Sequence, residues 1–176
     1  WMYEKLRTVA ARDSGMVLAC GPTGSGKTTT LYACLREIDI NTRNAITIED
    51  PVEYYLEGCT QIPIDHKQGN TFANILRSVL RQDPDVIFVG ELVDADTARA
   101  ALTAAEVGHL VISTMRASGV ADTVTRLIEL FPPAEQAQAR QSLLGTLRGF
   151  VNQRLLERAD GKGRTPAVEV LTGTAK

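Results

Sequence analysis

The sequence predicts an α/β fold in which helices flank a mainly parallel central sheet. The first observation is a glycine-rich loop, GPTGSGKT at residues 21–28, which stands between an apolar run and a helical pattern. The second is the alternation of apolar runs with helical patterns, which is typical of parallel sheets. With 176 residues and 44% apolar side chains, the chain can bury one sizeable core. We therefore expect a single domain over residues 1–176.

Apolar and alternating segments predict the strands. The run at 84–91, PDVIFVGE, is continuously apolar until its last residues, as expected of a parallel strand that is buried on both faces. The stretch 54–64 is expected to be a short extended segment at the sheet edge, because Pro63 cannot donate a ladder hydrogen bond. The remaining strands are expected at residues 16–20, 44–50, 109–114 and 166–171.

Helical periodicity predicts the elements between the strands. In the stretch 71–82 the apolar residues recur at helical spacing, and Thr71 is a candidate N-cap. A Pro-Pro pair is expected to open a C-terminal part, residues 132–176, that is helical and ends in the final strand. Helices are expected at residues 1–15, 28–38, 71–82, 95–108 and 131–158.

The glycine-rich loop predicts a phosphate-binding site. In the spacing G-x-x-x-x-G-K-T the glycines let backbone N–H groups point at phosphate oxygens, and the next helix adds the positive end of its dipole. By this motif's mechanics Lys27 reaches the β- and γ-phosphates, and Thr28 binds Mg²⁺ through its hydroxyl. A chance glycine turn is disfavoured by the strand before the loop and the helix after it. The expected nucleotide contacts are Gly21, Pro22, Thr23, Gly24, Ser25, Gly26, Lys27, Thr28 and Thr29.

Two groups of acidic residues are candidates for the chemistry of nucleotide hydrolysis. This reaction needs Mg²⁺ beside the phosphates and a group that orients the attacking water. Glu91 closes one predicted strand, where it would touch Mg²⁺ through water or polarise the nucleophile. Glu49, Asp50 and Glu53 follow another strand, and we expect Glu53 to be the general base.

Composition argues against several other classes of function. A net charge of -2 gives no overall basic field for a polyanion, so nucleic acid is not the expected partner. The three cysteines lie outside any CxxC pair, which predicts reduced thiols and no zinc site. No apolar run approaches the ~20 residues that span a bilayer. A small-molecule kinase would share the loop, but no lid or acceptor-pocket signature is present.

Four segments in order resemble the secretion ATPases, the hexameric motors of type II secretion and of type IV pilus assembly or retraction. The segments are GPTGSGKTTTLYACLREI, AITIEDPVEYYLEG, TFANILRSVLRQDPDVIFVGEL and TAAEVGHLVISTMRA. The resemblance covers about residues 15–171 and is far more specific than the glycine-rich loop alone. It implies a RecA-like domain that hydrolyses ATP between the subunits of a homo-hexamer.

The resemblance also assigns roles to individual residues. Residues 21–28 form Walker A, Glu53 takes the place of the catalytic glutamate, Gly90 and Glu91 form an atypical Walker B, and His109 opens the His box as a nucleotide contact. It further implies a cytoplasmic protein at the bacterial inner membrane. There the motion passes to a membrane platform protein, and membrane association occurs only through such partners.

Two positions depart from the family pattern. Val93 replaces an arginine, and Arg116 replaces the second histidine of the His box; an arginine can contact phosphate, but it cannot act as a neutral acceptor. A weakly active regulatory subunit of a ring is therefore the alternative, and a DNA-translocating relative is another. The chain is also expected to be an excised domain, without the family's N-terminal domain. Assembly, retraction and type II secretion stay open.

Overall fold

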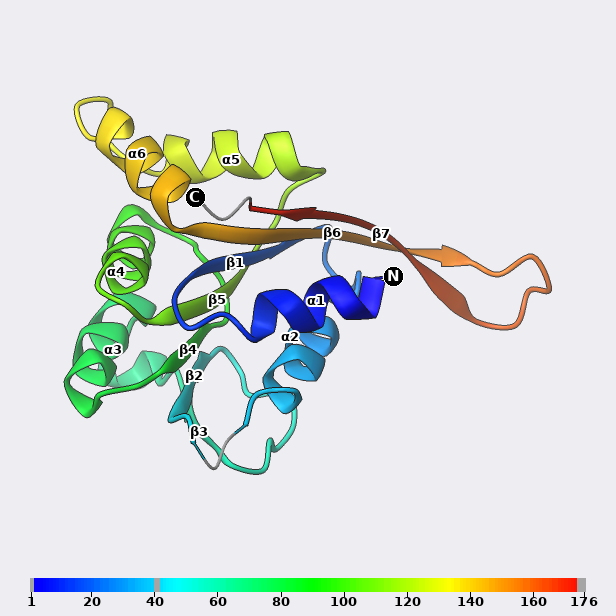
Figure 1. The fold of residues 1–176 in the computed structure, drawn as a ribbon, viewed down its shortest axis with the longest axis horizontal. Helices are drawn as coiled ribbons and strands as arrows, with labels where there is room; N and C mark the ends of the chain where they lie inside the picture. Colours follow the sequence, from blue (N-terminus) through cyan, green and yellow to red (C-terminus); the bar gives the residue numbers. More distant parts are fainter. Residues whose placement is uncertain (1, 40–41, 174–176) are drawn as a thin grey trace.

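A seven-stranded sheet forms the centre of the molecule, in the strand order β3-β2-β4-β5-β1-β6-β7 (Figure 1). The computed structural model describes residues 2–39 and 42–173. Neighbouring strands pair in parallel, except that β7 is antiparallel to β6. The predicted α/β class with a mainly parallel sheet is therefore confirmed. The strands are β1 Gly15–Cys20, β2 Ala45–Glu49, β3 Cys59–Pro63, β4 Val86–Val89, β5 Leu110–Met115, β6 Leu147–Glu157 and β7 Arg164–Thr172.

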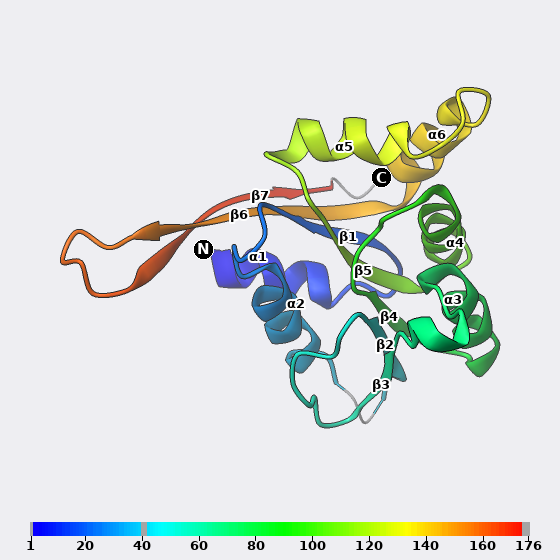
Figure 2. The same ribbon diagram turned by 180° about the vertical axis from the view of Figure 1, so that it is seen from behind.

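Helices cover both faces of the sheet (Figures 1 and 2). Side chains alternate between the two faces along a strand. Met16 and Leu18 of β1 therefore pack with α3, α4, α5 and α6, whereas Val17 and Ala19 pack with α1 and α2. The helices are α1 Met2–Ala10, α2 Lys27–Arg36, α3 Phe72–Val79, α4 Ala95–Glu106, α5 Val120–Glu129 and α6 Gln136–Thr146, with short 3-10 turns at His66–Gln68 and Leu80–Gln82.

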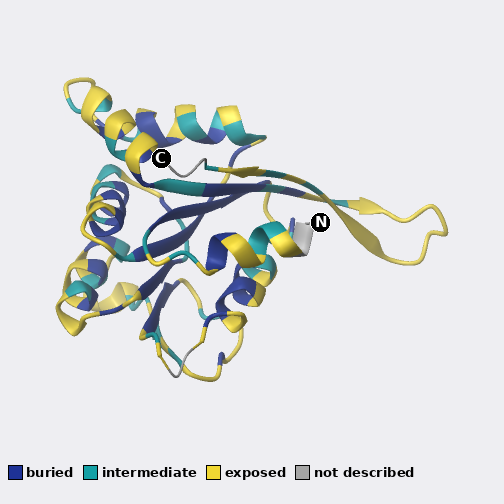
Figure 3. Cartoon of the chain, in the orientation of Figure 1, coloured by how far each residue is buried: buried dark blue, intermediate teal, exposed yellow. Residues whose placement is uncertain are grey.

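Burial explains which strands the sequence predicts well. Every residue of β1, β2, β4 and β5 is buried, because helices cover both faces of these strands (Figure 3). The edge strand β3 is only partly buried, in agreement with the edge position expected from Pro63. Thr71 is confirmed as the N-cap of α3, since its side chain accepts a hydrogen bond from the Asn74 amide.

The predicted helix at 131–158 is wrong over its second half. Helix α6 ends at Thr146, and residues 147–157 form β6, which pairs in parallel with β1. Phe150 and Val151 are adjacent in sequence and pack into the hydrophobic clusters on opposite faces of the sheet, which a strand permits and a helix does not. Beyond this buried root, β6 and β7 form a hairpin that extends away from the body and is exposed (Figures 1 and 3).

Candidate active site

The candidate active site lies where four parallel strands end. The glycine-rich loop follows β1, Glu53 follows β2, Glu91 follows β4, and Arg116 follows β5. Carboxyl ends of parallel strands meet at one edge of a sheet, which is where ligands bind in open α/β folds. These segments line one cavity of about 430 Å³. Its lining includes Thr23, Gly24, Lys27, Thr28, Glu53, Glu91, Val93 and Arg116. The structure thus brings Lys27, Glu53, Glu91 and Arg116, which come from separate motifs, into one site.

The loop has the backbone conformation that its glycines permit. Gly24 and Gly26 have φ angles of 75° and 86°, in the left-handed region that residues with a side chain rarely adopt. Gly26 is also the N-cap of α2, so that helix begins directly at the cavity. Lys27 Nζ donates hydrogen bonds to the carbonyl oxygens of Gly21 and Pro22, each at 2.9 Å. Burial lowers the pKa of Lys27, and the nearby Glu91 charge opposes that shift.

The donor set of the loop fits a phosphate with a bound Mg²⁺. Ser25 Oγ is buried and has no hydrogen-bond partner among the described residues, so a polar group is available in the wall of the loop. Thr28 and Glu91 line the same cavity, and hydroxyl and carboxylate oxygens are the ligands that Mg²⁺ prefers. Lys27 adds a positive charge beside them.

The three acids that follow β2 have different environments. Glu49 is buried, and its carboxylate accepts hydrogen bonds from the side chains of Tyr32, Thr47 and Gln61, so it holds the sheet edge together. Asp50 Oδ2 lies 2.8 Å from His66 Nε2.

Glu53 is exposed, and it lines the cavity together with Glu49 and Asp50. Within residues 2–39 and 42–173 no side chain is hydrogen-bonded to its carboxylate. It is therefore available to a water molecule beside the phosphates. The geometry favours Glu53 over Glu49 and Asp50 for the role of general base.

Glu91 forms a two-point ion pair with Arg116. Arg116 Nε lies 2.9 Å from Glu91 Oε1, and Arg116 Nη2 donates to Glu91 Oε2 at 3.2 Å. The arginine side chain is 68% exposed and the glutamate side chain 24%. Any contact of Glu91 with Mg²⁺ has to compete with this pair. The sequence motifs place both residues at strand ends but give no sign of the contact between them.

His109 lies at the opposite edge of the sheet. It precedes β5, whose amino end pairs with the amino end of β1, whereas the glycine-rich loop follows the carboxyl end of β1. Its Nδ1 lies 2.7 Å from the carbonyl oxygen of Pro84. The structure therefore does not bring His109 to the cavity of its own chain, because the length of β5 separates it from Arg116, and its contact with nucleotide stays a prediction.

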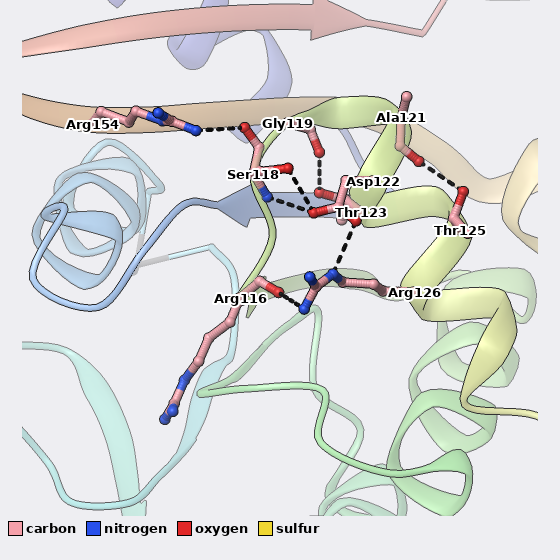
Figure 4. A network of polar contacts seen from close by, with 9 residues as sticks. All are labelled: Arg116, Ser118, Gly119, Ala121, Asp122, Thr123, Thr125, Arg126 and Arg154. Carbon is pink, nitrogen blue, oxygen red and sulfur yellow. Dashed lines mark hydrogen bonds and ion pairs between the residues drawn. The ribbon is translucent and has the colours of Figure 1, made fainter.

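A polar network holds the segment that carries Arg116 (Figure 4). Asp122 accepts hydrogen bonds from the Ser118 amide at 2.7 Å, the Ser118 hydroxyl at 2.8 Å and Arg126 Nε at 2.9 Å. These donors lower the pKa of Asp122 to about 2. Arg126 also donates to the Arg116 carbonyl, and Arg154 donates to the Ser118 carbonyl. Sequence analysis missed these residues, although the i,i+4 spacing of Asp122 and Arg126 was a usable signal.

Asp94, the acid retained beside the altered Val93, has a structural role. Its Oδ1 accepts a hydrogen bond from the Thr97 amide at 2.7 Å and caps the amino end of α4. Val93 itself is 50% exposed and lines the rim of the cavity.

Comparison with known proteins gives a consistent result. Residues 2–174 match the family described as "Type II/IV secretion system protein". A twitching motility protein of Neisseria gonorrhoeae is 43% identical over 167 residues, which is 93% of this chain and 45% of the relative. The type II secretion system protein HxcR of Pseudomonas aeruginosa is 47% identical over 153 residues, 87% of this chain and 31% of the relative.

Solved structures agree with the sequence relatives. The pilus retraction motor PilT with bound ADP has a TM-score of 0.87 at 40% identity, covering 98% of this chain and 51% of that structure. The ATPase DotB of Legionella pneumophila has a TM-score of 0.88 at 32% identity, covering 97% and 48%. The chain spans about half or less of the length of these relatives, and its fold is the RecA-like fold of such ATPases. The chain belongs to the type II/IV secretion system protein family.

Proposed function

We propose that this chain is the ATP-binding and ATP-hydrolysing motor domain of a secretion or type IV pilus ATPase. The observation that carries the proposal is the convergence of Lys27 and Thr28 with Glu53 and Glu91 on one cavity at the carboxyl ends of the parallel strands. A phosphate-binding loop, oxygen ligands for a metal and an accessible carboxylate are the components that nucleotide hydrolysis requires.

Each group has a defined task in this scheme. The N–H groups of the glycine-rich loop and the Lys27 ammonium bind the β- and γ-phosphates. Thr28 and Glu91 would hold Mg²⁺, which when bound neutralises charge that develops on the transferring phosphoryl group. Glu53 accepts the proton of the attacking water, and its exposed position lets that water enter from solvent.

The relatives and the exposed side of the cavity support two further parts of the proposal, the oligomer and the partner protein. Glu53 is exposed and Arg116 is 68% exposed, so a neighbouring subunit of a homo-hexamer could complete the site. The partner is proposed to be a membrane platform protein on the cytoplasmic side of the bacterial inner membrane. No helix in the described parts of the chain has the length and apolar character needed to span a bilayer.

A second candidate function is a nucleotide-binding, weakly active subunit that regulates a ring. The ion pair of Arg116 with Glu91 favours it, because the acid proposed to assist Mg²⁺ already has a cationic partner. The two candidates differ in turnover and agree in ATP binding.

Substitution of Lys27 tests the proposal. We expect Lys27→Ala to weaken ATP binding at least about tenfold and to abolish Mg-ATP hydrolysis, because a charge-assisted phosphate contact is lost. The measurements are fluorescent ATP binding and phosphate release. The matched control is Lys67→Ala, an exposed lysine outside the cavity, which should change neither. Wild-type protein that binds no ATP would contradict both candidates, and binding without turnover above the Lys27→Ala level would favour the regulatory one.

A further inference from the structure

We propose that Gln153 is a positioning residue of the phosphate-binding loop. The proposal rests on the proposed function, since it assumes that this loop binds phosphate. Gln153 is on β6, more than 120 positions after the loop, and is only 6% exposed. Its Nε2 donates a hydrogen bond to the Ser25 carbonyl oxygen at 2.7 Å, and its Oε1 accepts one from the Thr30 hydroxyl at 2.7 Å. One buried amide therefore links the loop to the helix that follows it.

The register of the sheet places Gln153 directly at the loop. Strand β1 ends at Cys20, which pairs with Asn152, so Gln153 is the first residue of β6 beyond the end of β1. A Cβ atom at Gly21 would lie 2.2 Å from the Gln153 carbonyl oxygen, and one at Gly26 would lie 2.7 Å from its Nε2. The loop backbone thus lies against β6 at this residue and at a distance that only glycine allows.

The contact to the Ser25 carbonyl fixes the direction of the next amide group of the loop. A peptide unit is planar and trans, so its N–H points opposite to its C=O. By holding the Ser25 carbonyl, Gln153 orients the Gly26 N–H, which belongs to the glycine-rich loop expected to bind phosphate. The hydroxyl of Thr30 donates to Oε1 and so leaves the Gln153 NH₂ group facing Ser25.

The chemistry explains why an amide is suited to this position. A glutamate could still accept the hydrogen bond of Thr30, but it could not donate to the Ser25 carbonyl, and its charge would repel phosphate. An apolar residue of similar shape would make neither bond and would leave buried polar groups without partners. Glutamine supplies one donor and one acceptor without charge.

The test compares the affinity for ligands that contain phosphate with the stability of the same protein variants. Dissociation constants for Mg-ADP and for inorganic pyrophosphate are measured by displacement of a fluorescent ADP, and denaturant midpoints are measured on the same preparations. Gln153→Met should raise both dissociation constants about tenfold. Gln153→Glu should raise them further, and Thr30→Val should raise them about threefold, because it removes only the contact that orients the amide.

The matched control is Gln136→Met. The Gln136 amide also donates to a backbone carbonyl, that of Phe131, but it lies outside the cavity. This control should leave pyrophosphate affinity within twofold of wild type whatever it does to stability. Gln153→Met protein that binds pyrophosphate like wild type would overturn the proposal, and so would an equal loss of affinity in the control. If Gln153→Met does not fold, Thr30→Val with unchanged affinity overturns it. Wild-type protein that binds neither ligand would instead refute the proposed function.

Discussion

At the scale of single residues, the pair formed by Arg116 and Glu91 distinguishes this site most clearly. The arginine stands where the resembling family has a histidine, and it contacts both oxygens of the acid proposed to assist Mg²⁺. A guanidinium stays protonated at physiological pH, whereas a histidine can lose its proton there. An arginine at this position therefore keeps its positive charge beside Glu91. Since Arg116 is largely exposed, solvent and salt screen the pair, and its strength is modest.

Removing this arginine should make Mg²⁺ easier to bind. We expect Arg116→Gln to lower the Mg²⁺ concentration for half-maximal ATP hydrolysis about two- to fivefold, which is the effect of losing one exposed competing ion pair. The measurement is a Mg²⁺ titration of the hydrolysis rate at saturating ATP. Arg99→Gln is the control, because Arg99 pairs with Asp96 and Glu135 away from this cavity. A half-maximal Mg²⁺ concentration that stays the same or rises would show that Arg116 does not compete with the metal.

At the scale of secondary-structure elements, the start of α5 controls the position of the segment that carries Arg116. Asp122 lies in the first turn of α5, accepts the Ser118 amide and holds Arg126, which in turn reaches the Arg116 carbonyl (Figure 4). An acid in the first helical turn also interacts favourably with the helix dipole. The contacts of this carboxylate therefore join a helix end to one wall of the site.

This arrangement predicts a pH-dependent contribution to stability. The pKa of Asp122 falls from 3.8 to about 2, so its stabilising effect is complete above pH ~4 and is lost as the pH falls toward 2. We expect Asp122→Asn to lower the Tm at pH 7 by on the order of 2 °C, and the difference from wild type should shrink below pH ~4. Calorimetry across this pH range tests it, with Glu106→Gln on α4 as an exposed-acid control. A difference that is constant with pH would contradict the assignment.

The elements also show where sequence reasoning succeeds and fails. Strand β4 was predictable because helices bury both of its faces, which leaves a continuous apolar run in the sequence. Strand β6 was not, because its buried root is short and its distal part, with charged and leucine residues, resembles an exposed helix. The role of Gln153 was missed with it, since no local pattern reports a contact across more than 120 positions.

In the candidate site, too, some features could be predicted from the sequence and others could not. The glycine-rich loop, Glu53 and Glu91 were predictable because each follows a recognisable strand, and parallel topology then brings the strand ends together. The position of His109 was not predictable, because a motif groups residues by sequence, whereas the two ends of β5 lie at opposite edges of the sheet. The pairing of Arg116 with Glu91 depends on two loops meeting in space, which the sequence does not encode locally.

At the scale of the whole molecule, β6 connects the exposed hairpin with the glycine-rich loop and with the segment that follows β5. Successive residues of a strand face opposite sides of the sheet. Gln153 accordingly contacts the glycine-rich loop, while Arg154 donates to the Ser118 carbonyl in the segment after β5. Beyond these two residues the β6–β7 hairpin extends away from the body (Figures 1 and 2).

The proposed function requires that this cavity hydrolyse ATP with Glu53 as the general base. The most direct measurement is Mg-ATP turnover and ATP affinity for wild type, Glu53→Gln and the control Glu57→Gln, an exposed acid of the same segment that does not line the cavity. We predict that Glu53→Gln lowers kcat about 100-fold or more while the Kd for ATP stays within about threefold, and that the control matches wild type. Glu53→Gln protein that turns over ATP at the wild-type rate would show that Glu53 is not the general base.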